Sequence, residues 1–191
     1  ELAIGGAEHG TVVVADKQTA GKGRRGRTWE SPAGTNLYFS ILLRPTFATE
    51  KAPMLTLVMA YSAAKAIREH LHMGAMIKWP NDLVLEKKKI CGILTEMTLN
   101  GMDIDHIVVG TGINVNLTEF PEELRGTATS LFLEKGTEID RKVLLEKVLQ
   151  EFWKQYELFV EKQNLSYLQK EYNAMLVNCG KEVCVLEPEN A

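Results

Sequence analysis

Fixed positive charge is concentrated between residues 21 and 29, where the sequence reads Gly-Lys-Gly-Arg-Arg-Gly-Arg-Thr-Trp. The three arginines present planar guanidinium groups that suit phosphate or carboxylate, and Lys22 adds a compact charge. The interleaved glycines let the backbone approach a ligand closely, and Trp29 offers a flat apolar face. Because the formal net charge of the whole chain is −3, these four cations are a local feature. We expect this loop to bind an anion that carries a ring.

The loop does not match the common nucleotide-binding glycine motifs. It lacks the Gly-Lys-Ser/Thr ending of a P-loop and the spacing of the dinucleotide-binding fingerprint. Two simpler interpretations stay open: a solvated basic turn, and a basic patch for nucleic acid or acidic lipid. The slightly acidic chain and the absence of a second basic stretch with aromatic partners favour a small anionic ligand over nucleic acid.

A second polar cluster is expected where a short apolar strand ends. The stretch Lys78-Trp79-Pro80-Asn81-Asp82 places a lysine, an amide and a carboxylate around a rigid turn. A plain turn is the alternative, but Lys78 and Asp82 beside the loop cations would form a charge-balanced polar site. Binding residues often lie in the segments that follow strands.

Two further segments combine polar side chains with glycine. Lys89 enters the apolar run Ile90–Leu94, so its side chain is expected to point inward, whereas Cys91 is most simply a core residue. The segment Gly110–Asn116 has glycines that let the backbone approach a flat ring. Asn114 carries an amide that can pair with the edge of adenine, although a bulged strand is the simpler interpretation of its glycines.

A sheet must position these segments. Apolar runs bounded by turn residues predict strands at 11–15, 36–44, 75–79, 83–85, 90–97, 104–110 and 113–117. Turns are expected at 80–82, at the charged tip 86–89 and at 100–103. Because several hairpins alternate with helices, we expect an α/β, α+β-like fold with a mixed, largely antiparallel central sheet and flanking helices.

Helical spacing of apolar residues predicts two long helices and a short one. The first runs from Pro53 to about Leu71, and the second covers 143–160 after the N-cap Asp140. Ser166 is expected to cap a last helix that ends near residue 176. One more strand is expected at 181–186, and a lone strand cannot form a core.

The composition is that of a soluble globular chain of 191 residues, with 45% hydrophobic and 25% charged residues. No apolar run reaches the ~20 residues of a membrane span. The three cysteines favour a reducing cytoplasm over a disulfide framework, and the four histidines lack metal-ligand spacing. We therefore expect a cytoplasmic protein without a direct metal site and without a membrane partner.

Taken together and in this order, the segments resemble the biotin protein ligases, also called biotin–acetyl-CoA-carboxylase ligases. The resemblance runs from about residue 10 to residue 176, and its most specific stretches are 18–29 and 78–83. The other matching stretches are 31–32 with 36–40, 89–94, 109–116 and 128–131.

The resemblance implies a two-step reaction. Biotin and Mg-ATP give biotinyl-5′-adenylate and pyrophosphate, and a lysine of a carrier domain then attacks the adenylate, releasing AMP. The catalytic residues implied are Arg24, Lys89 and Asp82. Biotin would be held by Gln18, Gly21, Lys22, Arg24, Lys89 and Gly92. ATP would be held by Arg24, Arg27, Trp29, Lys78, Asn81 and Asn114.

The same resemblance implies cofactors and partners. Biotin and ATP are the ligands, and Mg²⁺ would arrive on ATP without direct protein ligands. The expected partner is the biotin carboxyl carrier protein domain of acetyl-CoA carboxylase or a related carboxylase. The resemblance leaves open whether the chain forms a homodimer. No nucleic acid partner is expected. A lipoate ligase, which uses the same adenylation chemistry, is the main alternative, but it lacks the Arg-Arg-Gly-Arg-Thr-Trp run at 24–29.

The resemblance also implies a catalytic domain at 1–176 that is truncated at both ends. The family has a Ser-Thr-Asn motif in its biotin site upstream of the loop, and the sequence begins at Glu1 without that motif. Residues 177–191 would be the start, or a remnant, of the small C-terminal SH3-like β-barrel that the family carries.

Overall fold

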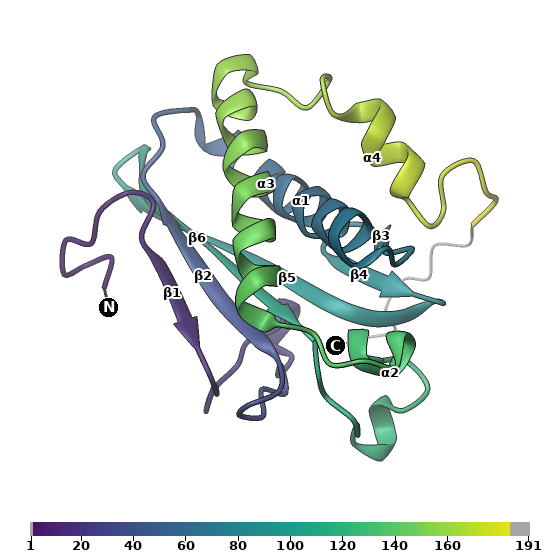
Figure 1. Ribbon diagram of the computed structural model, residues 1–191. Coiled ribbons are helices and arrows are strands. Elements are labelled where there is room, and N and C mark those ends of the chain that lie inside the picture. The colour runs from purple at the N-terminus through teal and green to yellow at the C-terminus, as the bar shows by residue number, and fades with distance from the viewer. Residues whose placement is uncertain (1, 184–191) are drawn as a thin grey trace.

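One antiparallel sheet of six strands organises the residues that this computed structural model describes, 2–183 (Figure 1). Its strands are β1 (Val12–Ala15), β2 (Leu37–Leu43), β3 (Met76–Lys78), β4 (Asp82–Leu85), β5 (Lys88–Asn100) and β6 (Asp103–Ile113). In space they follow the order β1-β2-β6-β5-β4-β3, and every neighbouring pair is antiparallel. The predicted fold class is confirmed. Within the described residues, parallel pairing is limited to two isolated bridges, Ile77 with Leu176 and Lys89 with Ala128.

Two hairpins differ from their predicted form. The turn between β4 and β5 is only Glu86 and Lys87, both with positive φ (45° and 71°), which suits the twist of a tight hairpin. The predicted four-residue tip 86–89 is therefore wrong, because Lys88 and Lys89 already belong to β5.

The prediction of two strands at 104–110 and 113–117 is also wrong. One strand, β6, continues through both glycines and ends at Ile113. Gly110 pairs with Ser40 of β2 on one side and with Leu94 of β5 on the other. Ladder pairing on both sides keeps the strand regular despite its glycines.

Two long helices, α1 (Met54–Leu71) and α3 (Arg141–Lys162), cover one face of the sheet (Figure 1). α3 begins where predicted, because the Asp140 side chain accepts hydrogen bonds from the N–H groups of the first turn. Each helix ends at a residue in the left-handed conformation, His72 and Gln163.

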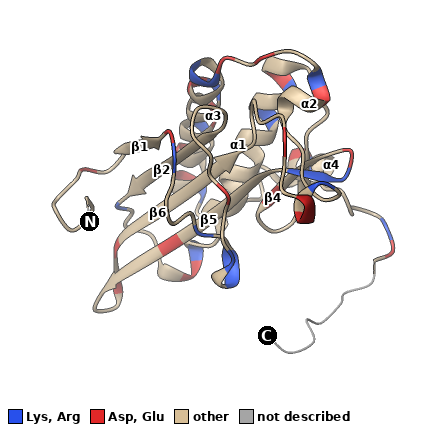
Figure 2. Ribbon diagram, turned by 90° about the horizontal axis from the view of Figure 1, so that it is seen from below, with Lys and Arg blue, Asp and Glu red and all other residues tan. Residues whose placement is uncertain are grey.

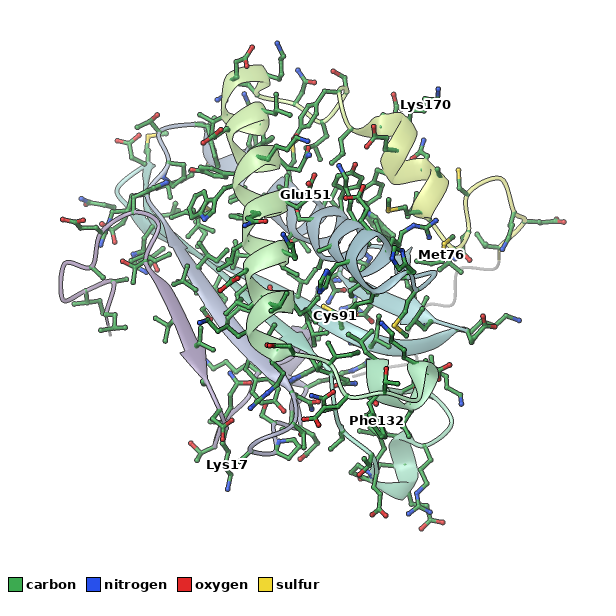
Figure 3. The ribbon with its side chains drawn as sticks, in the orientation of Figure 1. Lys17, Met76, Cys91, Phe132, Glu151 and Lys170 are labelled. Carbon is green, nitrogen blue, oxygen red and sulfur yellow. The ribbon has the colours of Figure 1, made fainter. Side chains whose placement is uncertain are left out.

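The apolar layer between these helices and the sheet is the core. Ala63 and Ala64 of α1 and Phe152 and Phe159 of α3 are fully buried in it, and the small alanines let the two helices approach closely. Each buried large apolar side chain contributes about 1.5–3 kcal/mol. Cys91 lies in this layer as predicted (Figure 3).

Shorter elements complete the described chain. They are α2 (Leu131–Lys135), α4 (Gln169–Met175) and three 3₁₀ turns at Arg24–Gly26, Thr49–Lys51 and Glu122–Leu124. The α2 helix was not predicted from the sequence, although the Ser130 hydroxyl caps it by accepting from the N–H of Leu133. The predicted cap at Ser166 is wrong, because α4 begins after Leu168 without a side-chain cap.

The ends of the chain leave two predictions without a test. Residues 181–183 form no strand, and the rest of the strand predicted at 181–186 lies outside the described residues. Of the barrel start predicted at 177–191, residues 184–191 lie outside the described part of the chain as well. Among the helices described, none is both long enough and apolar enough to cross a membrane.

Candidate functional site

On the sheet face opposite the helices, three glycines form a smooth backbone surface, which we call the floor. Along β5 and β6, alternate residues point to this face, and three of them are Gly92, Gly110 and Gly112. A Cβ atom on Gly112 would lie 2.5 Å from Trp29 Nε1, and one on Gly92 would lie 2.8 Å from the Trp29 ring. The floor is therefore glycine because an aromatic ring rests directly on the backbone.

The cationic loop folds over this floor as a small hairpin. The N–H of Gly23 donates to the carbonyl of Arg27 at 2.6 Å, and the N–H of Trp29 donates to the carbonyl of Gly21 at 2.9 Å. The turn itself needs positive φ at Arg25 (56°) and Gly26 (73°). The glycines of the loop thus serve its own turn as well as the approach to a ligand.

The base of the loop is fixed to the segments beside it. Ser31 Oγ donates to Gln18 Oε1 at 2.7 Å and also lies 3.1 Å from the carbonyl oxygen of Trp29. A Cβ on Gly21 would lie 2.4 Å from that same carbonyl oxygen, so only glycine fits there.

A cleft of about 270 Å³ remains between the loop and the floor. Of the predicted site residues, those that line it are Gln18, Lys22, Arg24, Trp29, Asn81, Lys89 and Gly92. A second hollow, of about 790 Å³ and open to solvent, lies along the loop and takes in Gly21 and Arg27. The structure therefore brings nine of the predicted residues to one place, the loop and the floor beneath it.

Lys89 stands at the centre of the charges in the cleft. Its Nζ lies 2.7 Å from Asp82 Oδ1 and 5.2 Å from the centre of the Trp29 ring. That Asp82 oxygen is buried, and no donor in the described residues meets it at a hydrogen-bonding angle. The short contact is thus an ion pair with poor hydrogen-bond geometry.

The backbone of Lys89 is fixed by a segment that comes much later in the sequence. Its N–H donates to the carbonyl of Thr127 at 2.8 Å, and its carbonyl accepts from the N–H of Thr129 at 2.9 Å. On the other side, β4 and β5 shift register at a bulge between Leu83 and Val84. Bulges re-aim side chains beside functional sites, and here the shift brings Lys89 toward Asp82.

Two predicted residues lie away from the cleft. Lys78 is exposed at the end of β3. Asn114 is 5% exposed, and its Nδ2 donates to the carbonyl of Thr129 at 3.1 Å. A role for Asn114 at the edge of adenine stays a prediction, and it requires that amide to leave Thr129.

Several residues of the site were missed at the sequence level. Ser40 and Glu96 line the cleft, and Ser31 holds Gln18. The strand period would have found Glu96, because residues 92, 94 and 96 share one face of β5. Ser40 is opposite Gly110 in the β2–β6 ladder, a pairing that the sequence alone does not reveal.

Electrostatics exclude one nucleophile and identify no metal centre. Burial raises the pKa of the Cys91 thiol far above its ordinary value, and the nearby Asp82 charge adds to that rise. The thiol is therefore neutral and unreactive at pH 7. In the part of the chain that is described, no group of three or more His, Cys, Asp or Glu could hold a metal ion. Charges of both signs are spread over the molecule (Figure 2).

Comparison with known proteins gives concordant similarities. A family model described as "Biotin/lipoate A/B protein ligase family" matches residues 1–114. The "Bifunctional ligase/repressor BirA" of Bacillus subtilis is 44% identical over 158 residues, which cover 82% of this chain and 49% of the relative. The protein of the same name from Escherichia coli is 35% identical over 167 residues, covering 87% and 52%. This chain thus spans about half the length of these curated relatives.

A solved structure shows the same fold. The biotin protein ligase from Aquifex aeolicus, in complex with biotin and ATP, superposes with a TM-score of 0.80 at 36% sequence identity. The match covers 90% of this chain and 71% of that one.

Proposed function

Since the chain belongs to the biotin/lipoate A/B protein ligase family, we propose that it is an ATP-dependent biotin protein ligase. One observation carries the proposal. Arg24 and Lys89 line one cleft over a glycine floor beneath a cationic loop, and Lys89 pairs with Asp82. This arrangement suits the joining of two anions, a carboxylate and a triphosphate, beside a carboxylate that can handle an amine.

The first step makes a mixed anhydride. A carboxylate oxygen of biotin attacks the α-phosphorus of ATP, the new C–O–P linkage forms, and the bond to pyrophosphate breaks. Charge builds on the phosphate oxygens in this transition state, and fixed cations in a partly enclosed cleft stabilise it. Arg24 and Lys89, which both line the cleft, are assigned to that role, and Arg27 in the neighbouring hollow to the outer phosphates.

The second step transfers the biotinyl group. The ε-amine of a carrier lysine attacks the carbonyl carbon, an amide forms, AMP leaves, and the amine loses its proton. A lysine is protonated at pH 7 because its reference pKa is ~10.4. Asp82 is assigned to orient this amine and accept or relay the proton. When Lys89 pairs with the incoming anions, its hold on Asp82 weakens, which would free the carboxylate for the amine.

The remaining contacts divide between the two ligands. Gln18, Gly21, Lys22 and Gly92 are assigned to biotin. Trp29 is assigned to pack on adenine, and Lys78 and Asn114 are assigned as further contacts to ATP. Support comes from the loop that closes over the floor, since an adenylate hydrolyses if it is exposed to water.

Mg²⁺ is proposed to arrive bound to the phosphates of ATP. Mg²⁺ commonly keeps several waters and binds through substrate phosphates with one or two carboxylates. Glu96 and Asp82 are the carboxylates of this region, so the donors present suit such a phosphate-borne ion. When bound, the ion would neutralise phosphate charge.

The proposed partner is the biotin carboxyl carrier protein domain of acetyl-CoA carboxylase or a related carboxylase. Assembly into a homodimer is left open. The curated relatives are named ligase/repressors, and that second activity is said of those proteins. Our proposal for this chain is the ligase reaction without a nucleic acid partner.

Pyrophosphate exchange tests the proposal against its alternatives. The chain is incubated with ATP, Mg²⁺ and labelled pyrophosphate, together with either biotin or lipoate. We expect label to enter ATP with biotin and not with lipoate. Exchange with lipoate alone would assign the chain to lipoate ligation, and a salt-sensitive shift of DNA without exchange would favour a nucleic-acid-binding module.

A further inference from the structure

A chain of hydrogen bonds links the cationic loop to the sheet through one side chain. Arg24 Nη1 donates to Asn81 Oδ1 at 3.0 Å, and Asn81 Nδ2 donates to the carbonyl oxygen of Ile93 at 3.1 Å. The N–H of Ile93 in turn donates to the carbonyl oxygen of Asn81 at 2.9 Å. Asn81 is therefore held against β5 by its main chain and its side chain, while its amide oxygen faces the loop.

The chemistry of this contact preserves the charge of Arg24. A neutral amide orients a guanidinium group but does not cancel its charge, whereas a carboxylate would form an ion pair with it. Arg24 is exposed, and a free arginine side chain has many rotamers to lose when a ligand binds. The bond to Asn81 restricts that freedom in advance and leaves four other guanidinium N–H groups for an anion.

We propose that Asn81 is a positioning residue that holds Arg24 over the cleft, instead of the direct ATP ligand that the sequence suggested. The side-chain N–H of Asn81 donates to the sheet and its side-chain oxygen accepts from Arg24. Asn81 therefore affects the ligand through Arg24. The proposal rests on the proposed function, because it takes Arg24 as the residue that retains the adenylate.

The test measures how fast labelled biotinyl-5′-adenylate leaves the protein in a chase with unlabelled adenylate. The adenylate is supplied ready-made, so the rate of its synthesis does not enter. The variants are Arg24→Ala, Asn81→Ala and the double variant. We expect Asn81→Ala to release the adenylate about threefold to tenfold faster, the scale of one ordinary hydrogen bond, and Arg24→Ala to release it at least as fast, because that change removes the guanidinium group itself. The double variant should match Arg24→Ala, because both changes remove the same contact.

A conservative variant and a matched control separate positioning from general damage. Asn81→Asp keeps an oxygen toward Arg24, but its carboxylate would pair with the guanidinium charge and it has no N–H for the carbonyl of Ile93, so it is expected to release the adenylate at least as fast as Asn81→Ala. Asn116 is the control, because its amide also joins two segments, through bonds of 2.9 and 3.0 Å to Ile139, and it lines neither the cleft nor the hollow along the loop. Asn116→Ala should release adenylate at the wild-type rate, even though the thermal midpoint of unfolding falls.

Two results would overturn the proposal. One is wild-type release by Asn81→Ala while the unchanged protein retains the adenylate. The other is a double variant whose release rate rises by the product of the two single-variant factors, since that would show that the two residues act independently. If the unchanged protein fails to retain biotinyl-adenylate at all, the proposed function falls and this inference falls with it, so the two failures are distinguishable.

Discussion

Lys89 connects several parts of the candidate site. It pairs with Asp82, faces the ring of Trp29, and has its backbone fixed by the 127–129 segment. Lys88, one position earlier, is exposed at the start of β5. Two lysines adjacent in sequence thus have opposite surroundings, which makes them a natural pair for a test.

Lys89→Ala should slow adenylate formation by about 10²-fold or more, the scale of losing one group that stabilises developing charge. The measurement is the single-turnover rate of biotinyl-adenylate formation at saturating biotin and ATP. Lys88→Ala should leave that rate within about twofold. An unchanged rate in Lys89→Ala would remove this lysine from the chemistry.

Asp82→Asn should affect the second step more than the first. The amide keeps the shape of the side chain but cannot take a proton, so transfer to a carrier lysine should slow by about 10²-fold. The measurement is single-turnover transfer from preformed adenylate. Hydroxylamine, which is largely unprotonated at pH 7, is the matched nucleophile and should lose far less. Equal losses with both nucleophiles would argue against proton acceptance.

At the scale of elements, the site depends on the alternation of β5 and β6. Ile93, Ile107, Val109 and Ile113 are buried in the apolar core beneath the helices, whereas Gly92, Gly110 and Gly112 face the loop. One strand therefore supplies the core on one side and a smooth floor on the other. The loop is able to close because this floor leaves room for the indole.

Gly112→Ala should prevent that closure. The added Cβ would meet Trp29 Nε1 at 2.5 Å, so the indole must move off the floor and the loop with it. We expect adenylate release at least tenfold faster, with a small change in the free energy of unfolding. Gly126 is the matched control, because its φ is ordinary and nothing lies within 4 Å of a Cβ there. Equal release rates in the two variants would contradict the assigned role of the floor.

Much of this architecture could be predicted because it is local. Periodicity and capping chemistry predict most of the strands, the helices α1 and α3, and the Asp140 cap. Residue type alone identifies the cation-rich loop and Lys89 as candidates for the site. What the sequence does not reveal is pairing. The bond from Arg24 to Asn81 spans 57 positions, and the burial of Asn114 under Thr129 depends on how a later segment returns to β5.

At the scale of the whole molecule, tyrosines of the helical layer give the fold a dependence on high pH. Burial raises the pKa of Tyr156, Tyr167 and Tyr172 to about 12 in each case. Burial and the adjacent Glu171 raise the pKa of Tyr61 further still. The folded chain therefore holds these phenol protons at a pH where the unfolded chain releases them.

The sign of the effect follows from proton binding. Between pH 10 and 12 the folded state binds more protons than the unfolded state, so stability is full below pH 10 and falls as pH rises. Each of the three tyrosines with a pKa of about 12 should cost about 1 kcal/mol by pH 11. Urea unfolding midpoints from pH 8 to 11 measure this. Tyr156→Phe should reduce the slope, and an unchanged slope would show that its phenol titrates normally.

The Trp29 indole that rests on the glycine floor is also a natural fluorescent probe of the cleft. The chain has three tryptophans: Trp79 is 67% exposed, Trp153 packs against Phe152 and Tyr156, and Trp29 lies beside the Lys89 ammonium group. Indole emission responds to polarity and to nearby charge. Replacing Trp79 and Trp153 by phenylalanine would leave Trp29 as a single built-in fluorophore, so ligand arrival and loop movement could be followed without any added label.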